Sequence, residues 1–415
     1  MQRIQPRTSF EGEFLLPGDK SITHRAIMFN ASANGEAVID NALMGEDCLS
    51  TCGCMRTLGA TVQTDGTSIF VKGAPAFRSG VELDCGNSGT TIRLLTGLLS
   101  GKKINAKLFG DASLSTRPMG RVAQPLNKLC ANVQTTDGKP PVHVFPAYLR
   151  GTELTLNVSS AQVKSAILLA GLSADGATTV TEPVKSRDHS ERMLRAMGAD
   201  IQIDGNTVRI NKSNLHTVNV DVPSDISSAA YFMALGALKG ETLCKNVGVN
   251  PTRAGIFKAF DKLGVRYTLQ NKRLSGGEEI ADVLVQRSYL QSIELGGADV
   301  PAMIDELPLI ALLCAFADGE SRIYGAKELR VKESDRIQTT AQLINALGGD
   351  CQATEDGFII RGKAKLAGGA IDSYRDHRIA MTGAVGLLAS QNGGEIYEAD
   401  CCAISFPDFF TKLGV

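Results

Sequence analysis

The stretch LPGDKSITHRA, residues 16–26, places a lysine, a hydroxyl group and an arginine within two turns of one predicted helix. Asp19 separates Gly18 from Lys20 and Ser21, so the spacing differs from that of a nucleotide-binding phosphate loop. The free N–H groups and the positive dipole end of a helix that begins near Lys20 favour an anion. An ordinary capped surface helix fits this stretch equally well.

Two further stretches in the first half have the same character. GNSGTTIRLL forms a tight polar turn before an apolar helical run that contains Arg93, and SLSTRPMGR places Arg117 on a loop fixed by Pro118. Each arginine is either a clamp for phosphate or carboxylate, or a structural or exposed charge. Ser160 and Gln162 stand at the mouth of another apolar helix, where capping groups are also common.

The second half adds carboxylates to the cations. ELRVKESDRI (328–337) holds three cations where a loop after a strand is expected, which is where α/β proteins place ligand groups. A solvated helix face is the common alternative for such a run. SYRDHRIAM adds cations at the start of an apolar helix, and IDELPLIALLCAF puts Asp305 and Glu306 at the head of another. Together these stretches predict a site for small polyanions, with acid and base groups that move protons.

Composition narrows the class of protein. The 415 residues include 43 glycines, no tryptophan and 5% aromatic residues, which suits a regular α/β protein. A net charge of −1 gives no global attraction to nucleic acid or membranes. Ten cysteines, of which Cys85, Cys130 and Cys314 lie in apolar runs, are interpreted as reduced structural thiols of a cytoplasmic protein. We find no nucleotide motif, metal-ligand spacing, signal peptide or transmembrane run.

A repeat runs along the chain. Glycine, a short β-type run, a loop and a helix ending in L-G or M-G recur from positions 35, 176, 240, 319 and 393, with a weaker copy near Gly101. Six units of roughly 60 residues suggest two domains of three units. Two similar strand–turn–helix segments, 14–33 and 218–238, suggest that the chain passes between domains twice. We therefore expect one domain at 17–222 and a discontinuous one at 1–16 plus 223–415.

Taken in order, the motifs resemble those of the 5-enolpyruvylshikimate-3-phosphate synthase family. They extend over nearly the whole chain: LPGDKSITHRA, GNSGTTIR, RPMGR, SAQVKSAILLAGL, SRDHSERML, SDISSAAYF, RVKESDRI, DHRIAM and SFPDFF. The residues of GDKSITHR and SAQVKSA resemble the class II branch of the family more than the class I branch. Ile404 and Glu328 stand where class I members have Lys and Asn, so neither is a site candidate.

The resemblance implies an α/β fold of two domains, each of three βαβαββ units in an inside-out α/β barrel, with the active site in the cleft between them. It implies transfer of the enolpyruvyl group of phosphoenolpyruvate to the 5-hydroxyl of shikimate 3-phosphate, with release of phosphate through a tetrahedral intermediate. This is a step of aromatic amino acid biosynthesis in the shikimate pathway and a target of glyphosate. No cofactor or metal, no nucleic acid, no membrane and a monomeric state are implied.

The resemblance also assigns roles to residues. Asp305 is the implied base, Glu333 the implied acid, and Lys20 reaches both substrates. The implied contacts of shikimate 3-phosphate are Lys20, Ser21, Arg25, Ser160, Ala161, Gln162, Ser186 or Arg187, Asp305 and Lys332. Those of phosphoenolpyruvate are Lys20, Asn87, Gly89, Arg93, Arg117, Gln162, Arg336, His377 and Arg378.

Two alternative functions agree less well with these residues. The related UDP-N-acetylglucosamine enolpyruvyl transferases would have Lys-Asn at Lys20 and Ser21 and a reactive cysteine in the loop before Arg117, and this chain has neither. A non-catalytic binding protein of the same fold is expected to lose Asp305, Glu333 or the arginines, and all are present.

Overall fold

The computed structural model describes residues 1–74, 76–275 and 277–415 and divides into two compact units. Unit 1 comprises Met1–Pro17, Pro223–Arg273 and Glu279–Val415, and unit 2 comprises Gly18–Val222 and Leu274–Glu278. The two main changes of unit lie within one residue of the positions that the sequence suggests. The grouping of Leu274–Glu278 with unit 2 has no counterpart in the repeat pattern.

Unit 2 has three four-stranded sheets in its described part, all built on one plan. In each, a first strand runs parallel to a second, a third pairs antiparallel with the second, and a fourth pairs antiparallel with the third. The sheets are β14 (Val220–Asp221), β3 (Glu36–Asp40), β5 (Ser68–Lys72) and β4 (Thr61–Asp65); β6 (Val81–Asp84), β7 (Ala106–Phe109), β9 (Lys139–Phe145) and β8 (Asn132–Thr136); and β10 (Glu153–Thr155), β11 (Thr178–Thr181), β13 (Thr207–Ile210) and β12 (Ile201–Asp204).

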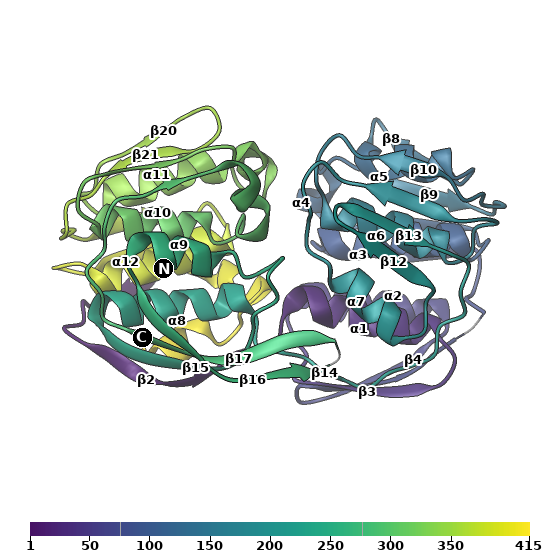
Figure 1. Ribbon diagram of the computed structural model, residues 1–415, viewed down its shortest axis with the longest axis horizontal. Helices are drawn as coiled ribbons and strands as arrows, with labels where there is room; N and C mark the ends of the chain where they lie inside the picture. Colours follow the sequence, from purple (N-terminus) through teal and green to yellow (C-terminus); the bar gives the residue numbers. More distant parts are fainter. Residues whose placement is uncertain (75, 276) are drawn as a thin grey trace. The chain divides into compact units, whose positions relative to one another are not determined.

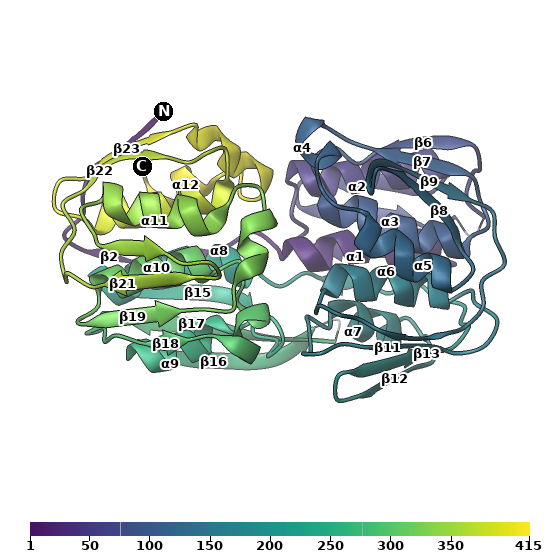
Figure 2. The ribbon, with the colours of Figure 1, turned by 90° about the horizontal axis from the view of Figure 1, so that it is seen from above.

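Helices fill the interior of unit 2, and the sheets lie outside them (Figures 1 and 2). Nearly every residue of α1 (Lys20–Ser32), α3 (Gly89–Gly101) and α6 (Ala161–Gly171) is buried. Burial on every side explains why α3 and α6 read as largely apolar all round rather than on one face, whereas α1 buries polar side chains such as His24, Arg25 and Asn30. The other helices are α2 (Glu46–Leu58), α4 (Ala112–Ser115), α5 (Gly120–Lys128) and α7 (His189–Ala196).

Unit 1 repeats the plan with one exchange. Two of its sheets have four strands: β2 (Phe10–Leu15), β15 (Gly240–Gly248), β17 (Glu278–Gln286) and β16 (Arg266–Ser275); and β18 (Glu294–Leu295), β19 (Glu320–Ile323), β21 (Phe358–Arg361) and β20 (Cys351–Ala353). The last sheet joins β22 (Gly369–Asp372) and β23 (Gly394–Tyr397) to β1 (Gln2–Ile4). The N-terminal strand β1 therefore takes the place of the strand that the last repeat lacks.

The interior of unit 1 is again helical (Figures 1 and 2). The buried helices are α8 (Ile226–Lys239), α10 (Leu307–Phe316) and α12 (His377–Ala389). The remaining helices are α9 (Ile256–Leu263), α11 (Arg336–Ala346) and α13 (Phe409–Leu413), with 3₁₀ turns η1 (Gly297–Ala302), η2 (Lys327–Val331) and η3 (Ala399–Ile404). Among the described residues, no helix is both long and apolar enough to span a membrane.

The two changes of unit are built alike. Strand β2 precedes α1, and strand β14 precedes α8. Asp19 and Asp225 cap these helices, and their carboxylates accept hydrogen bonds from the N–H groups of Ile22 and Ser227 at 2.8 Å each. An aspartate at this position satisfies an N–H group that the helix cannot. The predicted strand–turn–helix segments are therefore present in the structure.

A left-handed residue follows the second helix of each repeat. In five repeats it is the predicted glycine: Gly59, Gly198, Gly264, Gly348 and Gly414, with φ between 71° and 108°. In the weaker copy Cys130 takes this place at φ 64° and is exposed. Cys130 is a free thiol, as expected from the sequence, but it is exposed because the apolar run around it ends in a turn. The predicted α/β class and helix ends are confirmed.

Candidate functional site

The start of α1 concentrates positive charge. Lys20 Nζ lies 2.5 Å from the Asp47 carboxylate. The guanidinium of Arg25, one turn further on, donates to the hydroxyls of Ser190 at 2.7 Å and Ser165 at 3.1 Å, and to the carbonyl of Ser21 at 2.8 Å. Burial lowers the pKa of Arg25 to about 10, against the opposing effect of nearby carboxylates. Arg25 is thus a fixed, nearly dehydrated cation held by neutral groups.

Two arginines converge on the start of α3. Arg93 donates to the Gln162 amide oxygen at 2.9 Å, and Arg117 donates to the Asn87 amide oxygen at 2.6 Å. A Cβ atom on Gly89 would lie 2.6 Å from Arg93 and 3.2 Å from Arg117. The absence of a side chain at Gly89 therefore keeps both guanidinium groups beside the N–H groups of a helix start, an arrangement suited to an anion.

The start of α6 rests on a buried carboxylate, Glu182. Its oxygens accept from the N–H groups of Ser160 at 3.1 Å and Ser186 at 3.2 Å, and from the Ser186 hydroxyl at 2.9 Å. Lys164, 1% exposed, pairs with Glu182 and Glu191 at 2.8 Å each. Burial opposes the charge of Lys164, but the two carboxylates outweigh it and raise its pKa. This buried triad fixes the loop of Ser186 beside the first residues of α6, Ala161 and Gln162.

In unit 1, Arg336 gathers three carboxylates around one guanidinium. It lies 2.8 Å from Asp376, 2.6 Å from Glu333 and 3.5 Å from Asp305. Burial acts to lower the pKa of Arg336, but these neighbours outweigh it and raise the pKa above its ordinary value. Lys332 Nζ lies 3.9 Å from Asp305. The two carboxylates predicted to be base and acid therefore contact the same cation.

The first two residues of α12, His377 and Arg378, are buried although both side chains can carry a positive charge. Arg378 lies beside Tyr231, and burial raises the pKa of Tyr231 to about 12 while Arg378 acts in the opposite direction. Burial, and then Arg378, lower the pKa of His377 to about 4. His377 is therefore neutral at ordinary pH. It adds no positive charge for an anion, although it was predicted to line the phosphoenolpyruvate pocket.

One polar cluster of unit 1 has no clear signal in the sequence. Arg253 donates to both oxygens of Glu306 at 3.0 and 3.1 Å and to Asp225 at 3.3 Å, and the Ser227 hydroxyl contacts both Arg253 and Glu306. The pair Asp305–Glu306 marks the head of α10, but nothing local connects Glu306 with Arg253. This cluster holds the starts of α8 and α10 together.

The predicted site residues thus form one set in each unit. Unit 2 holds Lys20, Ser21, Arg25, Asn87, Gly89, Arg93, Arg117, Ser160, Ala161, Gln162, Ser186 and Arg187, and unit 1 holds Asp305, Lys332, Glu333, Arg336, His377 and Arg378. The Ser186 hydroxyl is committed to Glu182, whereas the half-buried Arg187 is close enough to Arg25 to lower its pKa. Ile404 lies in η3 and Glu328 in η2, both half-buried.

Comparison with known proteins is consistent along the whole chain. A family model described as EPSP synthase (3-phosphoshikimate 1-carboxyvinyltransferase) matches residues 4–413. The 3-phosphoshikimate 1-carboxyvinyltransferase of Geobacillus thermodenitrificans is 45% identical, covering 98% of this chain and 96% of that protein. That of Bacillus cytotoxicus is 44% identical over 100% and 99%.

Solved structures give the same result. An EPSP synthase from Acinetobacter baumannii superposes with a TM-score of 0.90 at 43% identity, covering 99% of this chain and 97% of that one. The enolpyruvyl transferase NikO from Streptomyces tendae has a TM-score of 0.81 at 21% identity and covers 99% of this chain and 96% of its own, which shows a shared fold alone.

Proposed function

Because the chain belongs to the EPSP synthase family, we propose that it transfers the enolpyruvyl group of phosphoenolpyruvate to the 5-hydroxyl of shikimate 3-phosphate and releases phosphate. The observation that carries the proposal is the contact of both Asp305 and Glu333 with the Arg336 guanidinium. Addition of an alcohol to the enol carbon of an enol phosphate requires a base for the hydroxyl proton and an acid for the methylene carbon close together.

The two carboxylates have different tasks. Asp305, with Lys332 and Arg336 nearby, takes the proton of the 5-hydroxyl as its oxygen attacks the enol carbon. Glu333 delivers a proton to the methylene carbon, which becomes a methyl group in the tetrahedral intermediate. In the second stage that carbon loses a proton, the double bond forms again and phosphate leaves. Arg336 favours ionised Glu333 in the free protein. When phosphoenolpyruvate binds, its anionic groups partly neutralise the charge of Arg336. The protonated form of Glu333 then becomes more favourable.

The cations supply binding and stabilise the leaving group. In this proposal Lys20, Ser21, Arg25, Ser160, Gln162 and Lys332 hold shikimate 3-phosphate, with Ser186 shaping the loop and Arg187 near the phosphate. Arg93, Arg117, Arg336 and Arg378 face phosphoenolpyruvate. Fixed cations beside a departing phosphate stabilise charge that develops in the transition state. The contacts of Arg25, Arg93 and Arg117 with hydroxyl and amide groups support this division.

The test is phosphate release by the purified chain. We expect release only when phosphoenolpyruvate and shikimate 3-phosphate are supplied together, with the enolpyruvyl ether as the carbon product. Replacement of shikimate 3-phosphate by UDP-N-acetylglucosamine is the control for the related transferase reaction. Turnover with that sugar nucleotide, or with phosphoenolpyruvate alone, would contradict the proposal.

The proposal extends to a monomer in the cytoplasm. All ten cysteines lie in the described ranges and are free thiols, which suits a reducing compartment. Sedimentation equilibrium of the active protein tests the monomer. A mass of two or more chains at the concentration used for assays would contradict it.

A further inference from the structure

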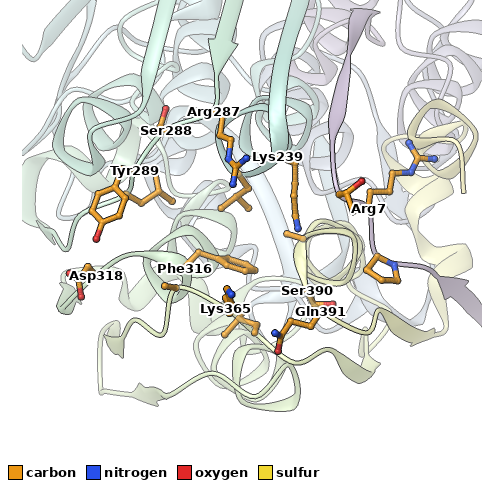
Figure 3. A pocket seen from close by; sticks show the side chains of 17 residues that line it. Arg7, Lys239, Arg287, Ser288, Tyr289, Phe316, Asp318, Lys365, Ser390 and Gln391 are labelled. Atoms are coloured by element: carbon orange, nitrogen blue, oxygen red, sulfur yellow. The ribbon is translucent and has the colours of Figure 1, made fainter.

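Unit 1 contains a cavity whose lining includes none of the predicted site residues. Its volume is about 620 Å³, and its lining includes the C-terminal ends of α8, α10 and α12 together with segments near Arg287 and Lys365. Of the site candidates in unit 1, Asp305 precedes the first residue of α10 and Arg378 lies in the first turn of α12, so both lie at the opposite ends of two of these helices. Figure 3 shows the lining side chains.

The cavity is rich in cations. Lys239, Arg287 and Lys365 make no side-chain hydrogen bond or ion pair with any residue that the structure describes, and Figure 3 shows Arg287 and Lys239 directed toward the same space. Arg7 is committed elsewhere, since it donates to the Gly414 carbonyl at 2.7 Å. Asp318 is the one carboxylate of the lining, and in Figure 3 it points away from the cations.

The negative C-terminal ends of the three helices do not neutralise these cations. Carbonyls in the last turns accept backbone N–H groups instead: Ala237 from Ser288 at 2.9 Å, Ala315 from Lys363 at 3.0 Å and Leu388 from Arg7 at 2.9 Å. Each helix end carries about half a negative charge, so three ends leave the three cations incompletely neutralised. In agreement, burial and the proximity of Arg287 lower the pKa of Lys239.

The equivalent end of unit 2 provides an internal comparison. The cavity at the ends of α1, α3 and α6 measures only about 140 Å³. Lys102 there donates to the Ser32 carbonyl at 3.4 Å and lies 5.6 Å from the centre of the Phe77 ring. That lysine serves the structure of its own unit. Lys239, Arg287 and Lys365 of the larger cavity make no comparable hydrogen bond or ring contact with the described residues. The fold that the two units share therefore does not require them.

We propose that this cavity of unit 1 binds a small molecule with two or more phosphate or carboxylate groups, held by Lys239, Arg287 and Lys365. The volume lies within the range of small-ligand pockets, and a partly enclosed cluster of unpaired cations is the electrostatic complement of such a molecule. The apolar Phe316 beside the cations leaves room for a carbon skeleton. The site is separate from the substrate residues and goes beyond the proposed function.

The test uses calorimetric titration of the full chain with pyrophosphate and, separately, with citrate, in the presence of saturating shikimate 3-phosphate. The variant Lys239→Gln/Arg287→Gln removes two charges from the cavity. The matched control, Lys272→Gln/Lys327→Gln, removes two charges from exposed lysines of unit 1 outside the lining. Steady-state assays of both variants verify that the substrate site is intact.

We expect at least one of the two probes to bind with a dissociation constant at or below about 1 mM. Affinity is expected to fall at least about tenfold in the cavity variant, to be unchanged in the control, and to decline with added salt. Response to pyrophosphate alone identifies the phosphate class, and response to citrate alone the carboxylate class. Absence of binding by both probes, or equal affinity of the cavity variant and the unaltered chain, would overturn the proposal.

Discussion

The helix starts of the two units use arginine in opposite ways. In unit 2, Arg25 is held by two serine hydroxyls and a carbonyl oxygen. In unit 1, Arg336 is held by the carboxylates of Asp376 and Glu333. The pKa of Arg25 is lowered by burial, whereas the carboxylates raise that of Arg336 above its ordinary value despite equal burial.

This difference separates two tasks. A buried cation whose hydrogen-bond partners are neutral is less completely neutralised than one in contact with carboxylates, so it gains more from an incoming anion. A cation that already has carboxylate partners keeps those carboxylates ionised and oriented, which is what proton transfer requires. In the proposed reaction, unit 2 would therefore supply mainly binding groups, and unit 1 the acid and the base. Lys20, paired with Asp47, is an exception in unit 2, as is Lys164 with Glu182 and Glu191.

Removal of the base should have the largest effect. Asp305→Asn is expected to lower kcat by about 1,000-fold with little change in the KM of either substrate, since general base catalysis contributes roughly 100- to 10,000-fold. Asp47→Asn in unit 2 is the matched change and should alter KM more than kcat. Steady-state kinetics with both substrates distinguish the two patterns. Equal losses of kcat in the two variants would break the division of tasks.

The stability of unit 1 should fall more on loss of Arg336 than the stability of unit 2 falls on loss of Arg25. Arg336→Gln leaves Asp376 buried without its cation, at a cost of about 3–5 kcal/mol. Arg25→Gln removes hydrogen bonds to hydroxyls and should cost about 1–3 kcal/mol. Hydrogen exchange resolved along the chain reports each unit separately. We expect amides of α11 to lose more protection in the first variant than amides of α1 in the second; the reverse order would contradict the comparison.

Acid should weaken both units through one buried histidine each. Burial lowers the pKa of His377 to about 4 and that of His24 well below its ordinary value. A lowered pKa means that the unfolded chain binds the proton first. The stability of unit 1 that depends on neutral His377 is therefore complete above pH 6.5 and declines as pH falls toward 4, by up to about 3 kcal/mol.

His377→Gln is the corresponding test. It should reduce the acid sensitivity of unit 1 between pH 6.5 and 4 and leave that of unit 2 unchanged, as followed by hydrogen exchange at several pH values. An identical pH profile of unit 1 with and without His377 would show that other groups control it.

The smallest change concerns Gly89. A methyl group there would meet Arg93 at 2.6 Å, so Gly89→Ala should displace that guanidinium. We expect the KM for phosphoenolpyruvate to rise about tenfold, equivalent to about 1.4 kcal/mol, and inhibition by glyphosate to weaken. Gly53→Ala in α2 is the control, because its Cβ meets nothing within 4 Å. Unchanged values for Gly89→Ala would separate Gly89 from the anion site.

The positions of the helix starts could be predicted from the sequence, but the ion-pair partners of the charged side chains near them could not. Asp19 and Lys20 sit where a cap and a first turn belong, and such local signals follow from backbone hydrogen bonding. The pairing of Arg253 with Glu306 spans 53 residues, a separation that no spacing rule covers. The same limit applies to the buried pairs of Lys164, which sequence inspection took as part of an apolar helix.

The sheet of the last repeat shows a second limit. The repeat pattern ends with the chain at Val415, yet β23 pairs with β1. Nothing in three residues at the N-terminus predicts which strand they join, since short strands carry little register information. Likewise, Cys130 adopts a conformation that glycine normally occupies, and only the other five repeats indicate that a turn is required there.

The pairing of β1 with β23 has a consequence for the order in which a ribosome produces the protein. Residues up to Val222 supply nearly all of unit 2, so this unit can fold while translation continues. Strand β1 is synthesised long before β23, so it finds its neighbour only after residue 397 has emerged. Unit 1 must therefore keep its earliest segment unpaired during almost the whole of synthesis, and it closes last.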